Sequence, residues 1–434
     1  MVAAGTISSS ALAAAFTTML GRELGETGFG TYALVIATAG LLSAVARAGL
    51  GPIVVRDIAR SVGDGQERAG SRQPIITALA ITASLSLVMA LVTISPLGTR
   101  LLEALGDLER GAVSALAILL AAQALYTLNA ESLRALHYLG SAATLGLPAQ
   151  RFVSLVLVAG AVYVAKSDLD PTQALWLTAI AAGVALAASG SALWARLRAV
   201  PPARLQRNIA VRMARDGAPI LVSNVLGLTA TRMPIWILAA LASLDEAGTF
   251  ALATAFVALI RLAHKTIIST LEPFVASAYH SGSRKSLQHR VRVAAAATST
   301  VAAAASVALL LVGRVAVPRL FDGDDFANVV GVAAILLLGT MSVVLAGPCG
   351  LLLNVTGNER WMARATVISV AVAAVAIYPA ASSAGAIGAA IVMAGSTVLR
   401  VALQLLYARR QTGIATHADF PAFIRSIRPG GRQP

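Results

Sequence analysis

The sequence contains few charged residues and a single cysteine, and each of these shortages excludes some classes of protein. Charged residues make up 12% of the 434 residues, whereas soluble domains usually have about 25%. Cys349 is the single cysteine, so no disulfide can form within the chain. The chain has no Walker sequence G-x-x-x-x-G-K-[ST], no H-E-x-x-H and no cysteine cluster. These absences argue against an ATPase and a zinc site, and we expect no cofactor.

Long apolar stretches are what the sequence has instead. Hydrophobic residues make up 57% of the chain, and the mean hydropathy is +0.77. This composition predicts an all-α polytopic membrane protein. In a soluble protein the net charge of +14 would suggest a nucleic-acid partner. In a membrane protein it indicates arginine-rich cytoplasmic loops and a few buried functional cations, so we expect no nucleic acid.

Twelve segments are long and apolar enough to cross a bilayer, for which a helix needs about 20 residues. The first lacks a basic leader and a clear cleavage site, so we expect a retained helix and not a signal peptide. The predicted segments are 2–20, 31–50, 74–95, 111–130, 147–165, 172–195, 217–241, 247–271, 293–313, 327–353, 363–379 and 385–408.

One short phrase occurs twice, at about half the length of the chain. Gly30-Thr31-Tyr32-Ala33-Leu34 aligns without gaps on Gly248-Thr249-Phe250-Ala251-Leu252. Such a repeat indicates an ancient duplication. It divides twelve helices into two lobes of six, 1–200 and 201–408, followed by a tail, 409–434. Because each lobe crosses the membrane an even number of times, the two lobes should be parallel.

The loops predict the orientation in the membrane. Basic residues concentrate in 51–73, 131–146, 196–216, 280–292, 354–364 and the segment after 408, whereas the opposite loops are short and acidic. Cytoplasmic loops carry the excess of Lys and Arg, so both termini should be cytoplasmic. The tail can form a short amphipathic helix with Phe420, Phe423 and Ile424 toward lipid, or it can be flexible.

Few ionisable residues fall inside the predicted membrane segments, and most of them are cations. The set comprises Arg47, Arg232, Arg261, Lys265, Arg400, His264 and the single acid Glu272. A charge at mid-membrane costs about 2.5–3.5 kcal/mol, so most of these residues should face water, a partner or a ligand. The surplus of positive charge predicts a cavity for an anion. Arg261 and Lys265 are four residues apart, so they can hold one polyanion from one helical face.

Several of these charges also have ordinary structural readings. Arg47, Lys265 and Arg400 lie near helix ends, where their side chains can reach the membrane surface. Glu272 can cap or pair at the interface, or it can couple transport to a proton or cation. His264 is more often a packed residue than a relay. Pro234 follows Arg232 closely and can either break the helix or pack as a kink.

Three stretches together resemble one family of membrane proteins. They are "LGRELGETGFGTYALVIATAGLLSAVARAGLGPIVVRDIAR" (20–60), the stretch from "GAPILVSNVLGLTATRMPIWILAAL" into "DEAGTFALATAFVALIRLAHK", and "LLLNVTGNERWMARAT" (351–366). They are similar to the Wzx-type polysaccharide-biosynthesis flippases of the multidrug/oligosaccharidyl-lipid/polysaccharide exporter superfamily. The resemblance covers essentially the whole chain, although this chain begins almost within its first helix, where family members usually have a basic segment.

The resemblance implies two six-helix lobes around a central cavity that works by alternating access. The cargo would be a polyprenyl-diphosphate-linked oligosaccharide, moved from the cytoplasmic to the external leaflet of the cell membrane. By position, Arg22, Arg47 and Arg56 match basic sites of the family's opening hairpin and loop, and Arg232 matches its helix 7 cation. Membrane lipids, a polysaccharide polymerase and glycosyltransferases are the partners this implies.

Two other functions are weighed against the flippase. A drug or cation antiporter of the MATE type would want acids in the cavity, where the sequence offers only Glu272. A scaffold of a glycan-synthesis complex would tolerate neutral replacement of Arg232 and Arg261, whereas a flippase would not. An enzyme is the least favoured class, because neither a poised acid or histidine nor a large extramembrane cleft is visible.

Overall fold

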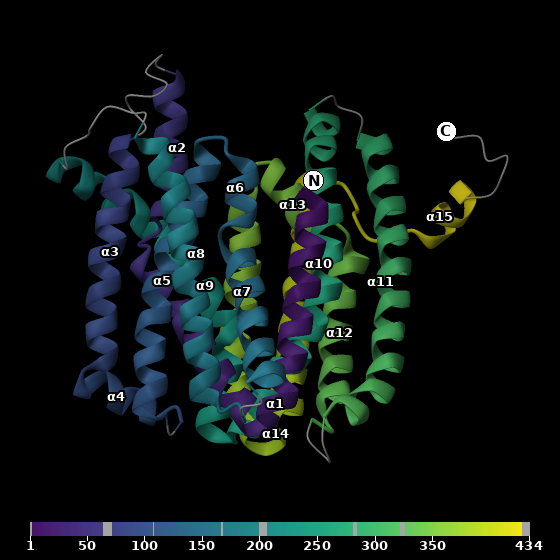
Figure 1. Cartoon of the computed structure of the whole chain (residues 1–434). Coiled ribbons are helices and arrows are strands. Elements are labelled where there is room, and N and C mark those ends of the chain that lie inside the picture. The colour runs from purple at the N-terminus through teal and green to yellow at the C-terminus, as the bar shows by residue number, and fades with distance from the viewer. Residues whose placement is uncertain are drawn as a thin grey trace. The chain divides into compact units, whose positions relative to one another are not determined.

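The computed structural model describes residues 2–63, 72–106, 108–165, 168–198, 206–280, 284–321 and 326–427. Within these ranges the protein is helical and has no strand, as predicted (Figure 1). The helices are α1 (Val2–Ala46), α2 (Leu50–Gly63), α3 (Arg72–Ile94), α4 (Pro96–Glu103), α5 (Arg110–Ala135), α6 (Leu139–Thr144), α7 (Leu147–Ala159) with the π-helical turn η1 (Gly160–Val164), α8 (Pro171–Leu197), α9 (Arg207–Leu241), α10 (Leu244–His280), α11 (Arg284–Leu320), α12 (Val329–Ala346), α13 (Cys349–Val355), α14 (Glu359–Thr412) and α15 (Phe420–Ile427).

The first helix, α1, is a hairpin of two helical arms. Gly25 has φ 65° and ψ −177°, values that a glycine adopts readily and that no helix contains. The rings of Phe16 and Tyr32 are 6.3 Å apart, although 16 residues of straight helix would separate them by about 24 Å. The two arms therefore pack against each other, which agrees with the two predicted segments 2–20 and 31–50.

The longest helix, α14, folds back in the same way. Its dihedral angles leave the helical region at Ala384 and Gly385. The hydroxyl of Ser396 donates to the carbonyl of Ser369 at 2.9 Å, although 27 residues of straight helix span about 40 Å. This fold separates the predicted segments 363–379 and 385–408.

The membrane-spanning character predicted from composition is confirmed in the described part of the chain. Nine helices there are long and apolar enough to cross a bilayer, and α1 and α14 among them each contain two arms. Each of the twelve predicted segments overlaps one or two helices. The layout of these helices as two parallel six-helix lobes stays a prediction.

Several predicted loops are helical, and the segment 51–73 is the clearest correction. It contains α2, whose residues Leu50, Ile53, Val54 and Ile58 are fully or almost fully buried. Their spacing places them on one face of a short helix, which packs into a core cluster against α3 and α5. A 14-residue amphipathic helix is too short to span the membrane. A prediction from hydropathy alone therefore assigns it to a loop.

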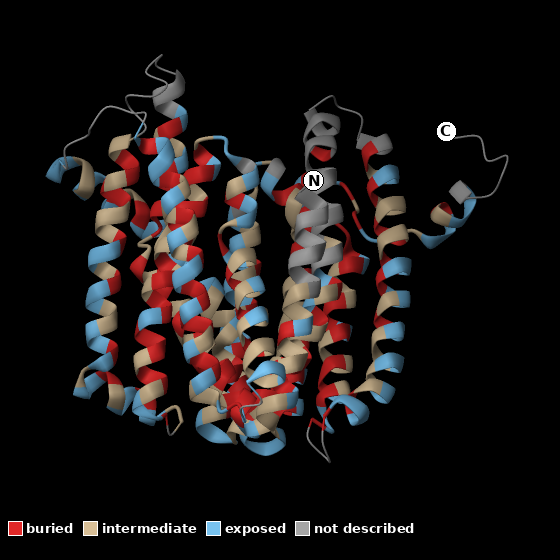
Figure 2. Ribbon diagram, in the orientation of Figure 1, coloured by how far each residue is buried: buried red, intermediate tan, exposed pale blue. Residues whose placement is uncertain are grey.

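Contacts divide the chain into two compact units, Met1–Gly248 and Thr249–Pro434. In the first unit α5 lies at the centre, packed against α1, α2, α3 and α8. Figure 2 shows buried residues along much of α5, whereas α3 exposes apolar side chains such as Leu87 and Leu91 on its outer face. The unit includes α9, because α9 packs on α1. The predicted lobe limits, 1–200 and 201–408, stay a prediction.

The second unit is built on the packing of α12 against α14 and of α11 against α12. The predicted segment 327–353 is interrupted, since α12 ends at Ala346 and α13 begins after Pro348. Three interactions hold the chain after α14 in place. The backbone N–H of Ala418 donates to the carbonyl of Leu345, the hydroxyl of Thr416 donates to the carbonyl of Ala346, and Arg292 pairs with Asp419 at 3.1 Å. The tail does form a helix, α15, in which Phe420 and Ile424 are exposed and Phe423 is half-buried.

Candidate functional site

The repeated phrase of the sequence has a structural counterpart in the first unit. A Cβ atom on Gly30 would overlap the carbonyl oxygen of Leu244, and a Cβ atom on Gly248 would overlap that of Glu26. The hydroxyl of Thr27 donates to the carboxylate of Asp245. Gly30 and Gly248, Glu26 and Leu244, and Thr27 and Asp245 are each 218 residues apart, the offset of the repeat. The two copies therefore meet in a self-complementary contact about a local pseudo-twofold axis.

Arg47 has an acidic partner that the sequence analysis did not assign to it. Its Nη1 lies 3.7 Å from Oε1 of Glu131, and both side chains are about one quarter exposed. Glu131 was placed in the predicted loop 131–146, but α5 continues to Ala135 and carries it. Glu272 is therefore not the only acid among the membrane helices. Because Glu131 neutralises Arg47, this arginine brings no surplus charge to an anion site.

A double-mutant cycle tests whether the Arg47–Glu131 pair is structural. Arg47→Gln alone is expected to lower the melting temperature of the purified protein, because it leaves a partly buried carboxylate unpaired. Adding Glu131→Gln should restore most of the loss, with a coupling free energy of about 1 kcal/mol. Thermal unfolding of the four proteins in detergent measures the coupling, and a value near zero would contradict the pair.

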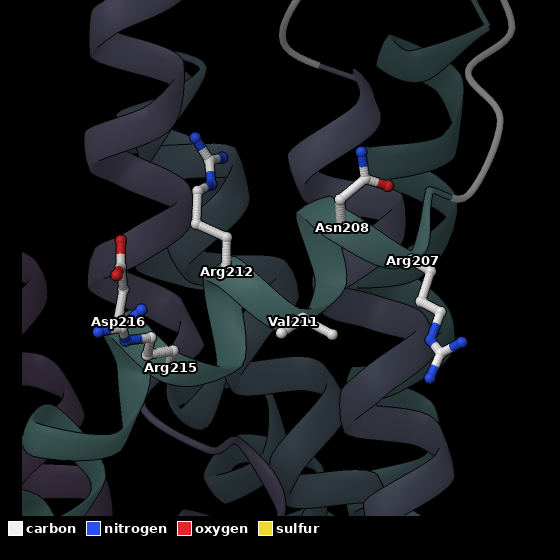
Figure 3. A pocket seen from close by; sticks show the side chains of 6 residues that line it. All are labelled: Arg207, Asn208, Val211, Arg212, Arg215 and Asp216. Atoms are coloured by element: carbon white, nitrogen blue, oxygen red, sulfur yellow. The ribbon is translucent and has the colours of Figure 1, made fainter.

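Arg56 belongs to a network of ion pairs that joins α2 to the first turns of α9. Its Nη2 lies 2.5 Å from Oδ2 of Asp216, and Nη2 of Arg212 lies 2.7 Å from Oδ2 of Asp57. The hydrogen bond to Asp216 raises the pKa of Arg56 above its ordinary value. Figure 3 shows Arg212 and Asp216 along the start of α9. The predicted loop 196–216 is therefore partly helix, and Arg56 serves here as a link between helices.

Two arginines lie inside the first unit at positions where their charges act on each other. Arg151, on α7, and Arg232, on α9, are half-buried and close enough for their charges to repel each other. Arg151 lies near the phenol groups of Tyr126 on α5 and Tyr32 on α1. Among the described residues neither arginine has an ion-pair partner. Two like charges held together in a membrane protein without an acid form a site that an anion would neutralise.

Arg151 is held in this position by its neighbour on α7. The hydroxyl of Tyr126 donates to Oε1 of Gln150 at 2.6 Å, and both side chains are buried. This bond fixes the turn of α7 that carries Arg151 against the central helix α5. Arg151 was not among the predicted site residues. The available signal was its position inside the predicted segment 147–165, where a cation needs an explanation.

Arg232 is half-buried on the side of α9 that packs on α1. Trp236 is one turn further along α9, on the same face, and its Nε1 donates to Oγ1 of Thr38 on α1 at 3.2 Å. Arg232 was predicted to be a cavity residue, and this orientation is consistent with that role. Pro234 is buried, and α9 runs through it without a break. Of the two readings of Pro234, packing within the helix is therefore the one observed.

The second unit holds an arginine pair of its own. The charge of Arg400 on α14 is repelled by that of Arg261 on α10. Arg261 is exposed and Arg400 is half-buried, beside the buried thiol of Cys349. Neither has an ion-pair partner among the described residues of this unit. Arg261 was predicted to act with Lys265, but the side chains of Lys265 and Glu272 lie outside the described part of the structure.

The remaining candidates are placed as follows. Arg22 is exposed, three residues before the turn of α1 at Gly25. His264 is half-buried on α10, and its Nδ1 makes no hydrogen bond. Within the described ranges no group of three His, Cys, Asp or Glu side chains could hold a metal ion.

Comparison with known families decides the class of the protein. The sequence profile described as "Polysaccharide biosynthesis protein" matches residues 1–279, well over half of the chain. The chain belongs to this family. This match confirms the family resemblance of the first two sequence stretches, which lie within the matched residues, whereas the stretch 351–366 lies outside them. A search of functionally curated proteins finds no significant match.

Solved structures of low sequence identity share the fold. One is an inward-facing multidrug resistance MATE family transporter of the MOP superfamily, with a TM-score of 0.72 at 14% identity, covering 94% of both chains. Another is the lipid II flippase MurJ in an inward closed conformation, with a TM-score of 0.70 at 11% identity. That alignment covers 98% of this chain and 89% of MurJ. The chain is therefore a multi-pass membrane protein that shares the fold of a transporter and of a flippase.

Proposed function

We propose that the protein is a flippase for a polyprenyl-diphosphate-linked oligosaccharide. It moves the lipid from the cytoplasmic to the external leaflet of the cell membrane by alternating access, with both termini in the cytoplasm. The product supplies the synthesis of a cell-surface polysaccharide. A polysaccharide polymerase and glycosyltransferases are the candidate partner enzymes.

The pair Arg151 and Arg232, which has no acidic partner among the described residues, is the observation that carries this proposal. The diphosphate is the part of the lipid that every glycan shares, and it is a compact polyanion. A guanidinium group donates two parallel hydrogen bonds to phosphate oxygens. Two such groups whose charges act on each other can bind the diphosphate together, while the sugar occupies water and the polyprenyl chain stays in lipid. Arg261 and Arg400 supply a second cationic pair in the other unit.

The antiporter alternative is less well supported by the described charges. A cation antiporter needs an acid that is free to bind its cargo. Glu131, which lies on a membrane-spanning helix, is already paired with Arg47. The local charge around Arg151 and Arg232 repels cations. The flippase is therefore the better proposal, even though MATE transporters share the fold.

Depletion of the protein in cells tests the proposal. The lipid extract is analysed by mass spectrometry before and after depletion. Accumulation of a polyprenyl-diphosphate oligosaccharide is expected, because synthesis continues while export stops. The mass of that lipid would also identify the sugar. An unchanged lipid pool together with altered sensitivity to cationic drugs would favour the antiporter.

A further inference from the structure

A charged pocket on the first turns of α9 lies apart from the proposed transport site. It has a volume of about 730 Å³ and is lined by Arg207, Asn208, Val211, Arg212, Arg215 and Asp216 (Figure 3). Three of the six lining residues are arginines and one is an acid. The loop charges place this end of α9 on the cytoplasmic side of the membrane. We propose that this pocket binds the headgroup phosphate of an anionic phospholipid in the cytoplasmic leaflet.

The charges that remain for a ligand can be identified. Arg212 is paired with Asp57, and Asp216 is paired with Arg56. Arg207 and Arg215 have no ion-pair partner among the residues that the structure describes, and both are exposed. The pocket therefore keeps two positive charges after its internal ion pairs are formed. This excess complements the negative charge of a phosphate headgroup.

The spacing of these residues fits an amphiphile better than a free anion. Arg207, Val211 and Arg215 follow each other at intervals of four residues, so they form one stripe along the helix. Val211 is 60% exposed between the two arginines. A stripe of cation, apolar side chain and cation can hold a phosphate and, at the same time, cover the start of a lipid chain.

Neighbouring side chains place the pocket at the level of the lipid headgroups. The last turn of α8 packs with the first turns of α9 in one core cluster, which contains Leu197 and Met213. On α8, Trp194 is half-exposed, and the guanidinium groups of Arg72 and Arg198 each lie 5.9 Å from its ring centre. Tryptophan and arginine together are typical of the interface between membrane and water.

The test uses the purified full-length protein in detergent, titrated with phosphatidylglycerol or with phosphatidylcholine. Native mass spectrometry counts the bound lipids. The variant Arg207→Gln/Arg215→Gln is expected to bind phosphatidylglycerol about 25-fold more weakly than the wild type, given the usual contribution of two arginines near a membrane surface. Binding of phosphatidylcholine should be weak in both proteins. The matched control is Arg409→Gln/Arg410→Gln, which removes the same charge from an exposed pair predicted to be on the same side.

The outcomes distinguish a specific lipid site from attraction by net charge, and they are independent of the transport activity. Equal losses in the variant and in the control would overturn the proposal, because they would show attraction by net charge alone. Inorganic phosphate is added as a competitor of bound phosphatidylglycerol. If it displaces the lipid as well as free phosphatidylglycerol does, the proposal would also be overturned, since the stripe is proposed to bind a lipid. The inference does not depend on the flippase proposal. A loss of bound phosphatidylglycerol would support it even if the lipid extract of depleted cells were unchanged.

Discussion

Replacing Arg232 or Arg151 by glutamine should lower the export of surface glycan roughly 10- to 100-fold. A hydrogen bond to a charged group contributes about 1.5–3 kcal/mol, and each 1.4 kcal/mol corresponds to about a factor of ten in affinity. Glutamine is shorter than arginine but stays polar and carries no charge, so the helices should insert and pack normally. The surface polysaccharide of cells that carry each variant in place of the wild type measures the effect.

Two controls distinguish charge from structure in this experiment. Arg232→Lys keeps the charge but loses the planar pair of donors, so it should retain part of the activity. Arg100→Gln removes an exposed arginine on α4 and should leave export unchanged. Protein levels in the membrane must be equal in all strains. Normal export from both Arg151→Gln and Arg232→Gln would show that the anion site is elsewhere.

Leucine at Gly30 or Gly248 should prevent the contact between the two repeat copies and abolish export. Any side chain at these positions overlaps a backbone carbonyl of the opposite copy. Such overpacking costs about 1–3 kcal/mol, which corresponds to a roughly 5- to 150-fold shift away from the closed contact. Alternating access requires that each end of the transporter can close, so a contact that cannot form should stop the cycle.

Crosslinking reports on this contact directly. Thr27→Cys and Asp245→Cys are introduced into a chain that lacks its native thiol through Cys349→Ala, and a short thiol-specific crosslinker is added. Adding Gly30→Leu should reduce the crosslinked fraction to background. The matched control is Gly40→Leu on the same helix, where an added Cβ meets no atom within 4 Å. An undiminished crosslink in the Gly30→Leu protein would mean that the backbone contact is not required.

The sequence was sufficient to predict the helical membrane fold, because a stretch of about 20 consecutive apolar residues usually forms a membrane-spanning helix. It also located the sharp turns of α1 and α14, since polar and glycine-containing segments separate the apolar stretches there. The phrase at Gly30 and Gly248 predicted a repeat, and the structure shows the two copies in contact. Amphipathic α2 was missed, because hydropathy averages its buried and exposed faces together.

The candidate site was only partly predictable, because pairing between distant residues leaves little trace in one sequence. Arg232 was recognised from its depth within an apolar segment. Arg47 looked equally unpaired, but its partner Glu131 lies 84 residues further along and seemed to belong to a loop. Arg151 lies near the start of its segment, and its environment depends on Tyr126, Gln150 and Tyr32 from three helices. Such contacts depend on how the helices pack together, so the local sequence pattern does not predict them.

Reconstitution of the purified protein into vesicles tests the central claim most directly. A polyprenyl-diphosphate-linked oligosaccharide is placed in one leaflet, and its sugar becomes accessible to an added glycosidase only after it crosses the bilayer. We predict translocation by the wild-type protein that is much faster than in protein-free vesicles and that the Arg151→Gln/Arg232→Gln variant loses. Equal rates in wild-type, variant and protein-free vesicles, with a correctly folded protein present, would contradict the account.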